Sequence, residues 1–202
     1  MLYETSLLTN NTLITLTNTT SIVAESVKSY SFDVWTRFLE IVFSPFNYKD
    51  MLWILAPMII TFLLIEFYFG IYAEEKLGWN TAFGNSLVLL FVSLDIGRNL
   101  YESGLIYEDK IKTLIFMIIF IEAILLALLD FFHFLPERFA FKISGSLPIN
   151  FSAVSAIILV YTNIKVDFIT ISALLLLLIF MILFIGLMHK IEPKVGNPKF
   201  LN

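Results

Sequence analysis

The sequence predicts an all-α fold, a polytopic integral membrane bundle of about five transmembrane helices preceded by an interfacial amphipathic helix. Two observations support this class. The 202-residue chain is 58% apolar and only 15% charged, a composition typical of multi-span membrane proteins and rare among soluble domains. Runs of about twenty mostly apolar residues recur along it, and each is long enough to cross a bilayer as a helix. We therefore expect one compact bundle over residues 47–190, without a separate soluble domain.

Charge and residue usage exclude several functional classes. The formal net charge of −4 and the lack of a basic stripe argue against a nucleic-acid partner. The chain has no cysteine and only two histidines, which lie far apart, so neither a metal site nor another cofactor is expected. It carries no zinc-protease, nucleophile-elbow or phosphate-loop motif. We therefore expect no enzymatic activity, and an intramembrane enzyme is a distant alternative. The start, Met1 to Glu4, lacks the pattern of a cleavable signal peptide.

The first 26 residues form a Thr/Asn-rich segment without a clean helical stripe. We expect a mobile or loosely strand-forming tail there. Asn10 and Asn18 each begin an N-glycosylation pattern. Because this short pattern recurs by chance in such a composition, a bare polar tail is the alternative interpretation.

Residues 27–46 are expected to form the amphipathic helix. Its apolar positions recur at spacings of three and four: Phe32, Trp35, Phe38, Leu39, Val42 and Phe46. Asp33, Arg37 and Glu40 lie on the other side of the helical wheel. Two placements are open, since such a helix can lie in the plane of the membrane interface or dock its apolar face on the bundle.

Five spans follow, predicted at about residues 51–72, 80–100, 112–135, 143–162 and 166–188. The first contains Pro57, which predicts a kink or helix break. The second has a helix-packing face of small residues within an arc of about 60°: Ala82, Ser86, Ser93 and Gly97. Small residues in a row let another helix approach closely. Asp95 and Arg98, at i and i+3 on the same span, can neutralise one another.

The third span carries the most unusual polar residues of the chain. Glu122, Asp130 and His133 fall within an arc of about 80° on its helical wheel. An acidic residue near mid-bilayer costs on the order of 3 kcal/mol when it faces lipid. We therefore expect this face to turn toward other helices or toward a wet cavity.

The last two spans differ in character. Gly145, Pro148 and Asn150 make the first half of the fourth span weakly apolar. We expect a helix broken near Pro148, and a re-entrant half followed by a short helix is the alternative. The fifth span is apolar almost all round, which predicts a place at the lipid-facing edge. Residues 191–202 contain two prolines and are expected to form a loose tail.

The sequence carries only a weak signal for the orientation of the chain in the membrane. Equal numbers of basic residues flank the two sides of the predicted bundle, so the positive-inside rule does not choose between the two orientations. The polar Thr/Asn tail favours a multi-pass protein of the cell membrane with its N-terminus outside and its C-terminus inside.

With this topology, six polar residues form a rough column through the bundle: Glu66, Asn85, Asp95, Glu122, Asp130 and His133. One hypothesis is a small transport or channel-type protein that passes protons or a small cation along these groups, with Glu122 at its centre. The structural alternative is that the buried acids bond to polar side chains on neighbouring helices and fix which helices pair.

A second functional hypothesis is a non-catalytic membrane scaffold or a subunit of a larger complex. It would use the small-residue face and the amphipathic helix to bind another membrane subunit or a second copy of the chain within the lipid bilayer. Transport predicts that Glu66, Glu122 and residues 148–155 converge on one polar cavity. A scaffold predicts a dry core and an exposed groove of small residues.

Overall fold

The computed structural model describes the backbone of residues 2–71 and 78–191, with the side chains of residues 2–21, 69 and 70 left out of that description. All elements in these ranges are helices: α1 (Leu2–Asn47), α2 (Lys49–Ile71), α3 (Trp79–Glu102), α4 (Leu105–Glu108), α5 (Lys110–Phe131), α6 (Glu137–Ile143), α7 (Ser146–Tyr161) and α8 (Phe168–Ile191). The expected loose tail at residues 191–202 and the possible glycosylation of Asn10 and Asn18 fall almost entirely outside the described residues and side chains.

Five stretches of the described chain are long and apolar enough to cross a membrane: Lys49–Tyr68, Trp79–Glu102, Lys110–Phe131, Glu137–Tyr161 and Phe168–Ile191. Their order and approximate bounds match the five spans expected from the sequence. The predicted fold class, a polytopic helical membrane bundle, is confirmed.

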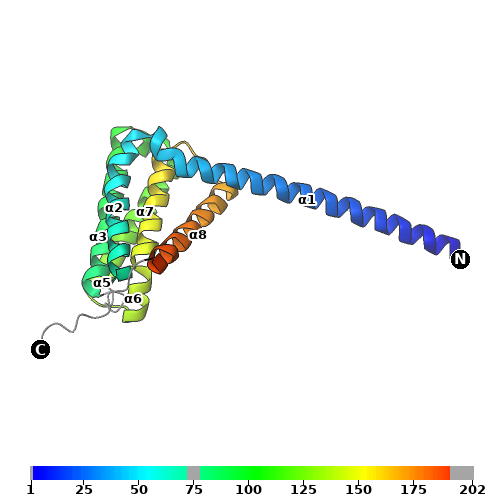
Figure 1. Cartoon of the computed structure of the whole chain (residues 1–202). Helices are drawn as coiled ribbons and strands as arrows, with labels where there is room; N and C mark the ends of the chain where they lie inside the picture. The colour runs from blue at the N-terminus through cyan, green and yellow to red at the C-terminus, as the bar shows by residue number, and fades with distance from the viewer. Residues whose placement is uncertain (1, 72–77, 192–202) are drawn as a thin grey trace, which may run out of the picture.

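Helices α2, α3, α5 and α7 form the body of the bundle, and α1 extends away from it (Figure 1). Helix α3 packs most extensively on α5 and also on α7, while α2 packs on α7 and α8 packs mainly on α1. The shared core contains fully buried apolar side chains from four of these helices, among them Leu55, Leu89, Ile96, Ala123 and Ile157. Many side chains of α8 are exposed, including Leu175, Ile179 and Leu183, as the uniformly apolar sequence of this span predicts for a lipid-facing helix.

The α3–α5 interface is closed by the small residues of α3. Ala82, Ser86 and Ser93 are fully buried, and a Cβ atom on Gly97 would lie 2.7 Å from the ring of Phe116 on α5. The two helices approach closely because these positions carry little side-chain volume. The small-residue face is therefore filled inside the bundle and is not an exposed groove.

The fourth span is broken between α6 and α7, at Ser144 and Gly145, a few residues before the expected position at Pro148. Pro148 instead lies in the first turn of α7, where a missing N–H removes no helical hydrogen bond. A Cβ atom on Gly145 would lie 3.0 Å from the carbonyl oxygen of Phe141, so a side chain is poorly accommodated at the break. Pro57 does not end its helix, because α2 continues through it.

The third span ends earlier than expected, at Phe131 instead of residue 135. His133 adopts a left-handed backbone conformation with φ of 55°, and the N–H of Phe134 donates to the carbonyl of Leu129 over 3.1 Å. This is the geometry of a helix C-terminus closed by a left-handed residue. His133 therefore lies beyond the helix and not on its polar face.

The N-terminal helix differs from the expected tail and short helix. Its backbone is helical from Leu2 onward, without a boundary near residue 27. A helix that has already formed can extend without a second nucleation step, and nucleation is the costly step. This accounts for the helical backbone of the Thr/Asn-rich segment. Phe38, Ile41 and Ser44 are buried against the bundle. Most of the predicted apolar face remains exposed instead: Phe32, Trp35, Leu39, Val42 and Phe46.

Candidate functional site

A groove of about 370 Å³ lies between α2 and α3. Its two walls are adjacent in the sequence, yet α2 and α3 each pack on α7 and make little contact with one another. The groove exists because α7 holds the two helices apart. The wall on α2 comprises Asp50, Trp53, Ile54, Pro57, Met58 and Thr61, and the wall on α3 comprises Val88, Phe91, Val92, Asp95 and Arg98.

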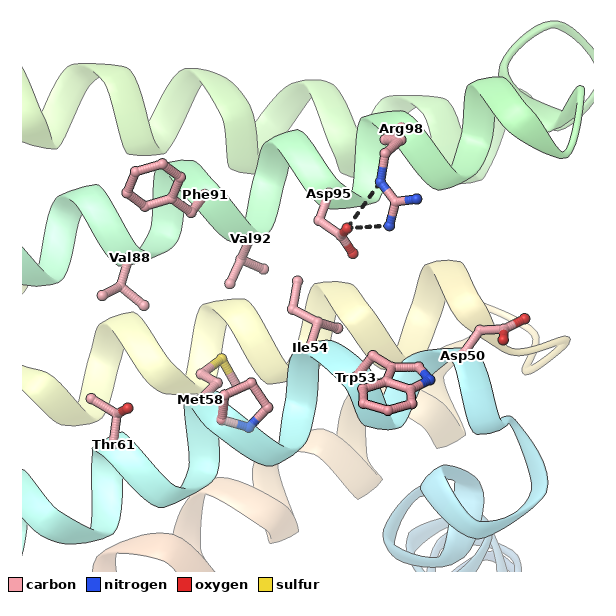
Figure 2. A pocket seen from close by; sticks show the side chains of 11 residues that line it. Asp50, Trp53, Ile54, Met58, Thr61, Val88, Phe91, Val92, Asp95 and Arg98 are labelled. Atoms are coloured by element: carbon pink, nitrogen blue, oxygen red, sulfur yellow. Dashed lines mark hydrogen bonds and ion pairs between the residues drawn. The ribbon is translucent and has the colours of Figure 1, made fainter.

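A polar cluster occupies one end of the groove, and Figure 2 shows its side chains reaching from α3 toward α2. One carboxylate oxygen of Asp95 accepts from both Nε and Nη2 of Arg98, at 3.2 and 2.5 Å. The other oxygen accepts from the hydroxyl of Tyr161 on α7 over 2.6 Å. Arg98 also reaches Glu102 at 3.2 Å. Asp95 is therefore fixed from two helices, because each of its oxygens has its own donor.

Apart from Thr61, the rest of the groove is lined by apolar side chains, and it is open at its side. Met58 and Val92 are buried, whereas Trp53 is 85% exposed and Phe91 is 69% exposed at the rim. Asp50 stands at the same end as the Asp95–Arg98 pair. Its exposed carboxylate has no hydrogen-bond or ion-pair partner among the residues that the structure describes. The groove thus combines a charged end with an apolar length that faces the surroundings of the bundle.

Of the six residues expected to form a polar column, Asp95 is the only one that lines this groove. Glu66 lies beside α8, where its carboxylate is 3.7 Å from Nε2 of His189. Glu122 is half-buried between α5 and α7, and its carboxylate accepts from Ser152 over 3.3 Å. The two acids therefore have different partners on different helices.

The remaining three residues of the expected column are also separated. Asp130 is 1% exposed and accepts from Ser86 on α3 over 2.7 Å. Asn85 donates over 2.9 Å to the carbonyl of Ser144, at the break before α7. The ring of His133 packs edge-on against Trp79, with centroids 4.2 Å apart, so it does not lie on one polar face with Asp130.

Sequence reasoning missed Asp50 and Trp53, which line the groove, and Tyr161, which bonds to Asp95 from α7. Tyr161 ends the fourth span and Asp50 begins the first, so both resemble ordinary residues of a span end. Trp53 follows Asp50 by three residues and has the character of an interface anchor. The spacing of Asp50 and Trp53 at the end of a span was a signal that could have been noticed. Only the packing of α2 and α3 on α7 places these two residues opposite Asp95.

Comparisons with protein-family models, with curated proteins and with solved structures found no match to this chain.

Proposed function

We propose that this protein is a non-catalytic membrane scaffold or a subunit of a larger membrane complex, in which α1 is the element that binds the partner. The observation that carries this proposal is the way α1 is mounted on the bundle. The helix has 46 residues and is therefore about 70 Å long. The C-terminal part of α1 lies on the bundle, and its N-terminal part projects far away from the bundle (Figure 1).

The mounting is specific. Arg37 on α1 donates over 3.0 Å to the hydroxyl of Thr170 at the start of α8, and Tyr30 bonds to Ser172 over 2.7 Å. The ring of Phe38 packs edge-on against Phe180, with centroids 6.3 Å apart. Polar and apolar contacts together fix the direction in which α1 projects.

Before Tyr30, the first of these contacts, every residue of α1 whose side chain is described is exposed, from Ile22 to Ser29. The large apolar residues among them are Ile22, Val23 and Val27. Exposed apolar side chains along a mounted helix are typical of a protein interaction site. The partner is another membrane subunit or a second copy of the chain.

The hypothesis of proton or cation transport has less geometric support. The buried acids bond separately to Ser86, Ser152 and His189, and none of Glu66, Glu122 or Asp130 lines the groove that contains Asp95. A conduction path needs neighbouring groups that exchange protons or share a hydrated space. These pairings instead favour a structural role in helix association.

Site-specific photo-crosslinking in native membranes tests the proposal. A photoreactive residue at Val27 on α1 should give a discrete protein adduct, because this position is 62% exposed on the projecting helix. The matched control is Ile118 on α5, which is 54% exposed on a membrane span and should give lipid adducts. A lack of any protein adduct at Val27 would contradict the scaffold.

Proteoliposome flux measurements separate the two functional hypotheses. The scaffold predicts no proton, K⁺ or Na⁺ flux above that of empty liposomes. Flux that falls in Glu122→Gln and persists in the surface variant Glu108→Gln would establish transport instead.

A further inference from the structure

We propose that the groove between α2 and α3 binds one phospholipid of the bilayer, a zwitterionic lipid with a primary ammonium in its headgroup. One acyl chain lies along the apolar walls, the ammonium contacts Asp50, and the phosphate contacts the exposed edge of Arg98. This site goes beyond the scaffold function and does not depend on it, because it involves no residue of α1.

The length of the groove matches one leaflet of a bilayer. Its α2 wall runs from Asp50 to Thr61, which is about 16 Å along a helix. The hydrocarbon core of a bilayer is about 30 Å thick, so one leaflet contributes about half of that. An acyl chain whose headgroup is at the charged end therefore reaches the far end of the groove without crossing the midplane.

The same length argues against a transmembrane helix of a partner as the occupant. Such a helix crosses the whole membrane and packs along its full length. The lining ends at Thr61 on α2 and at Val88 on α3, about half-way through the span. All charged residues of the lining lie at one end, which is the pattern of a ligand with a polar head and an apolar tail.

The charges at this end select the headgroup. The lining contains two carboxylates, Asp50 and Asp95, and one guanidinium, Arg98. Both oxygens of Asp95 are already bonded, whereas the exposed carboxylate of Asp50 is free of partners in the described part of the chain. A primary ammonium can donate up to three hydrogen bonds to such a carboxylate, and a quaternary ammonium can donate none. Arg98 is 60% exposed and retains an edge for a phosphate.

Tryptophan quenching by brominated lipids tests the site. The protein carries Trp35→Phe and Trp79→Phe, so that Trp53 at the groove rim is the only tryptophan. It is reconstituted in phosphatidylcholine nanodiscs that contain an equal, small fraction of one lipid with brominated chains. We expect brominated phosphatidylethanolamine to be enriched about two- to fivefold over brominated phosphatidylcholine at Trp53. This ratio corresponds to the free energy of one water-exposed, charge-assisted hydrogen bond.

Two variants and one control make the result specific. Asp50→Asn should remove the preference for phosphatidylethanolamine, and Thr61→Phe, which fills the apolar end, should reduce quenching by every brominated lipid. Glu108→Gln, an exposed acid on α4 outside the groove lining, should change neither result. Equal quenching by both lipids, stronger quenching by brominated phosphatidylglycerol, or a preference that survives Asp50→Asn would overturn the proposal.

Discussion

The two sides of α3 contact the bundle in opposite ways. Toward α5, the helix presents Ser86 and Gly97, and the two backbones come together until Phe116 leaves no room for a Cβ atom on Gly97. Toward α2, it presents Phe91 and Asp95, and a groove remains open. Both sides belong to one helix of one span. The difference shows that side-chain volume decides where helices close in a membrane, because lipid offers no hydrophobic force to push them together.

Polar groups follow the same division. On the closed side, Ser86 and Asp130 bond to each other and are fully buried. On the open side, Asp95 and Arg98 pair near the end of the span, where Arg98 is 60% exposed. A polar group that water cannot reach depends on its protein partner, whereas one at the end of the bundle can exchange that partner for water.

Ser86→Ala should cause the largest loss of stability. Oδ1 of Asp130 already lacks a partner among the described residues, and the substitution leaves Oδ2 without one as well. We expect the free energy of unfolding in detergent micelles to fall by about 2–3 kcal/mol. Ser93→Ala is the control, because the hydroxyl of Ser93 is equally buried but donates only to the carbonyl of Leu90 in its own helix. Equal losses in the two variants would remove the special role of the α3–α5 bond.

Gly97→Leu tests the close approach itself. A side chain here must displace Phe116, and overpacking of this kind costs about 2 kcal/mol. Gly84→Leu on the same helix makes the same chemical change where nothing lies within 4 Å of the added Cβ atom, so thermal melting of the two variants isolates the contact. Combining Gly97→Leu with Phe116→Ala should recover part of the loss. Equal melting temperatures of the two glycine variants would contradict the close packing of α5 on α3.

Protonation of Asp167 should have a smaller effect, because this carboxylate lies at the end of the bundle. It accepts from the backbone N–H of Thr170 over 2.8 Å, and this bond lowers the pKa of Asp167 from its ordinary value. A lowered pKa in the folded state means that the contribution to stability is present above the unfolded pKa of about 3.9 and is lost as the pH falls through the folded pKa. Because Thr170 also binds Arg37, the acid loss should include loosening of α1.

Melting temperatures measured between neutral and acid pH check this prediction. In Asp167→Asn, the melting temperature should fall less steeply as the pH is lowered. The part of the fall that other acidic groups cause should stay the same. A matching control is Asp33→Asn on α1, an exposed acid for which no side-chain bond is described. The same flattening in both variants would mean that general surface charge, and not the start of α8, sets the acid limit.

Phe91→Ala should have the smallest effect on stability. This side chain is 69% exposed at the rim of the groove, so its removal leaves no cavity, and a change within about 0.5 kcal/mol is expected in micelles. The measurement is the same unfolding assay used for Ser86→Ala. A loss as large as that of Gly97→Leu would show that the groove is closed in the protein and that the two sides of α3 are alike.

The sequence predicted the contacts within one helix of the site, but not the contacts between helices. The Asp95–Arg98 pair follows from a spacing of three within one helix, because both residues share a face whatever surrounds them. The bonds of Asp95 to Tyr161 and of Asp130 to Ser86 join different helices, and no local spacing contains them. The expected common face of Asp130 and His133 is wrong because the helix ends at Phe131, before the periodic face reaches the histidine.

The N-terminal helix illustrates the same limit. Helical periodicity places Trp35, Leu39 and Val42 on one face, but it does not say which face meets the bundle. Those three side chains are exposed, whereas Phe38 of the predicted face and Ile41 are buried. Arg37 and Tyr30 form hydrogen bonds to α8.

Segment length and hydrophobicity were enough to predict a helical membrane protein with five spans at these positions, because both are properties of each segment alone. Tertiary structure decided which polar groups pair, that α5 fills the small-residue face of α3, and that α2 remains apart from α3 on the opposite side. Those outcomes depend on which helix occupies each face, and this is settled only when all five spans compete for the same contacts in a medium that satisfies no polar group.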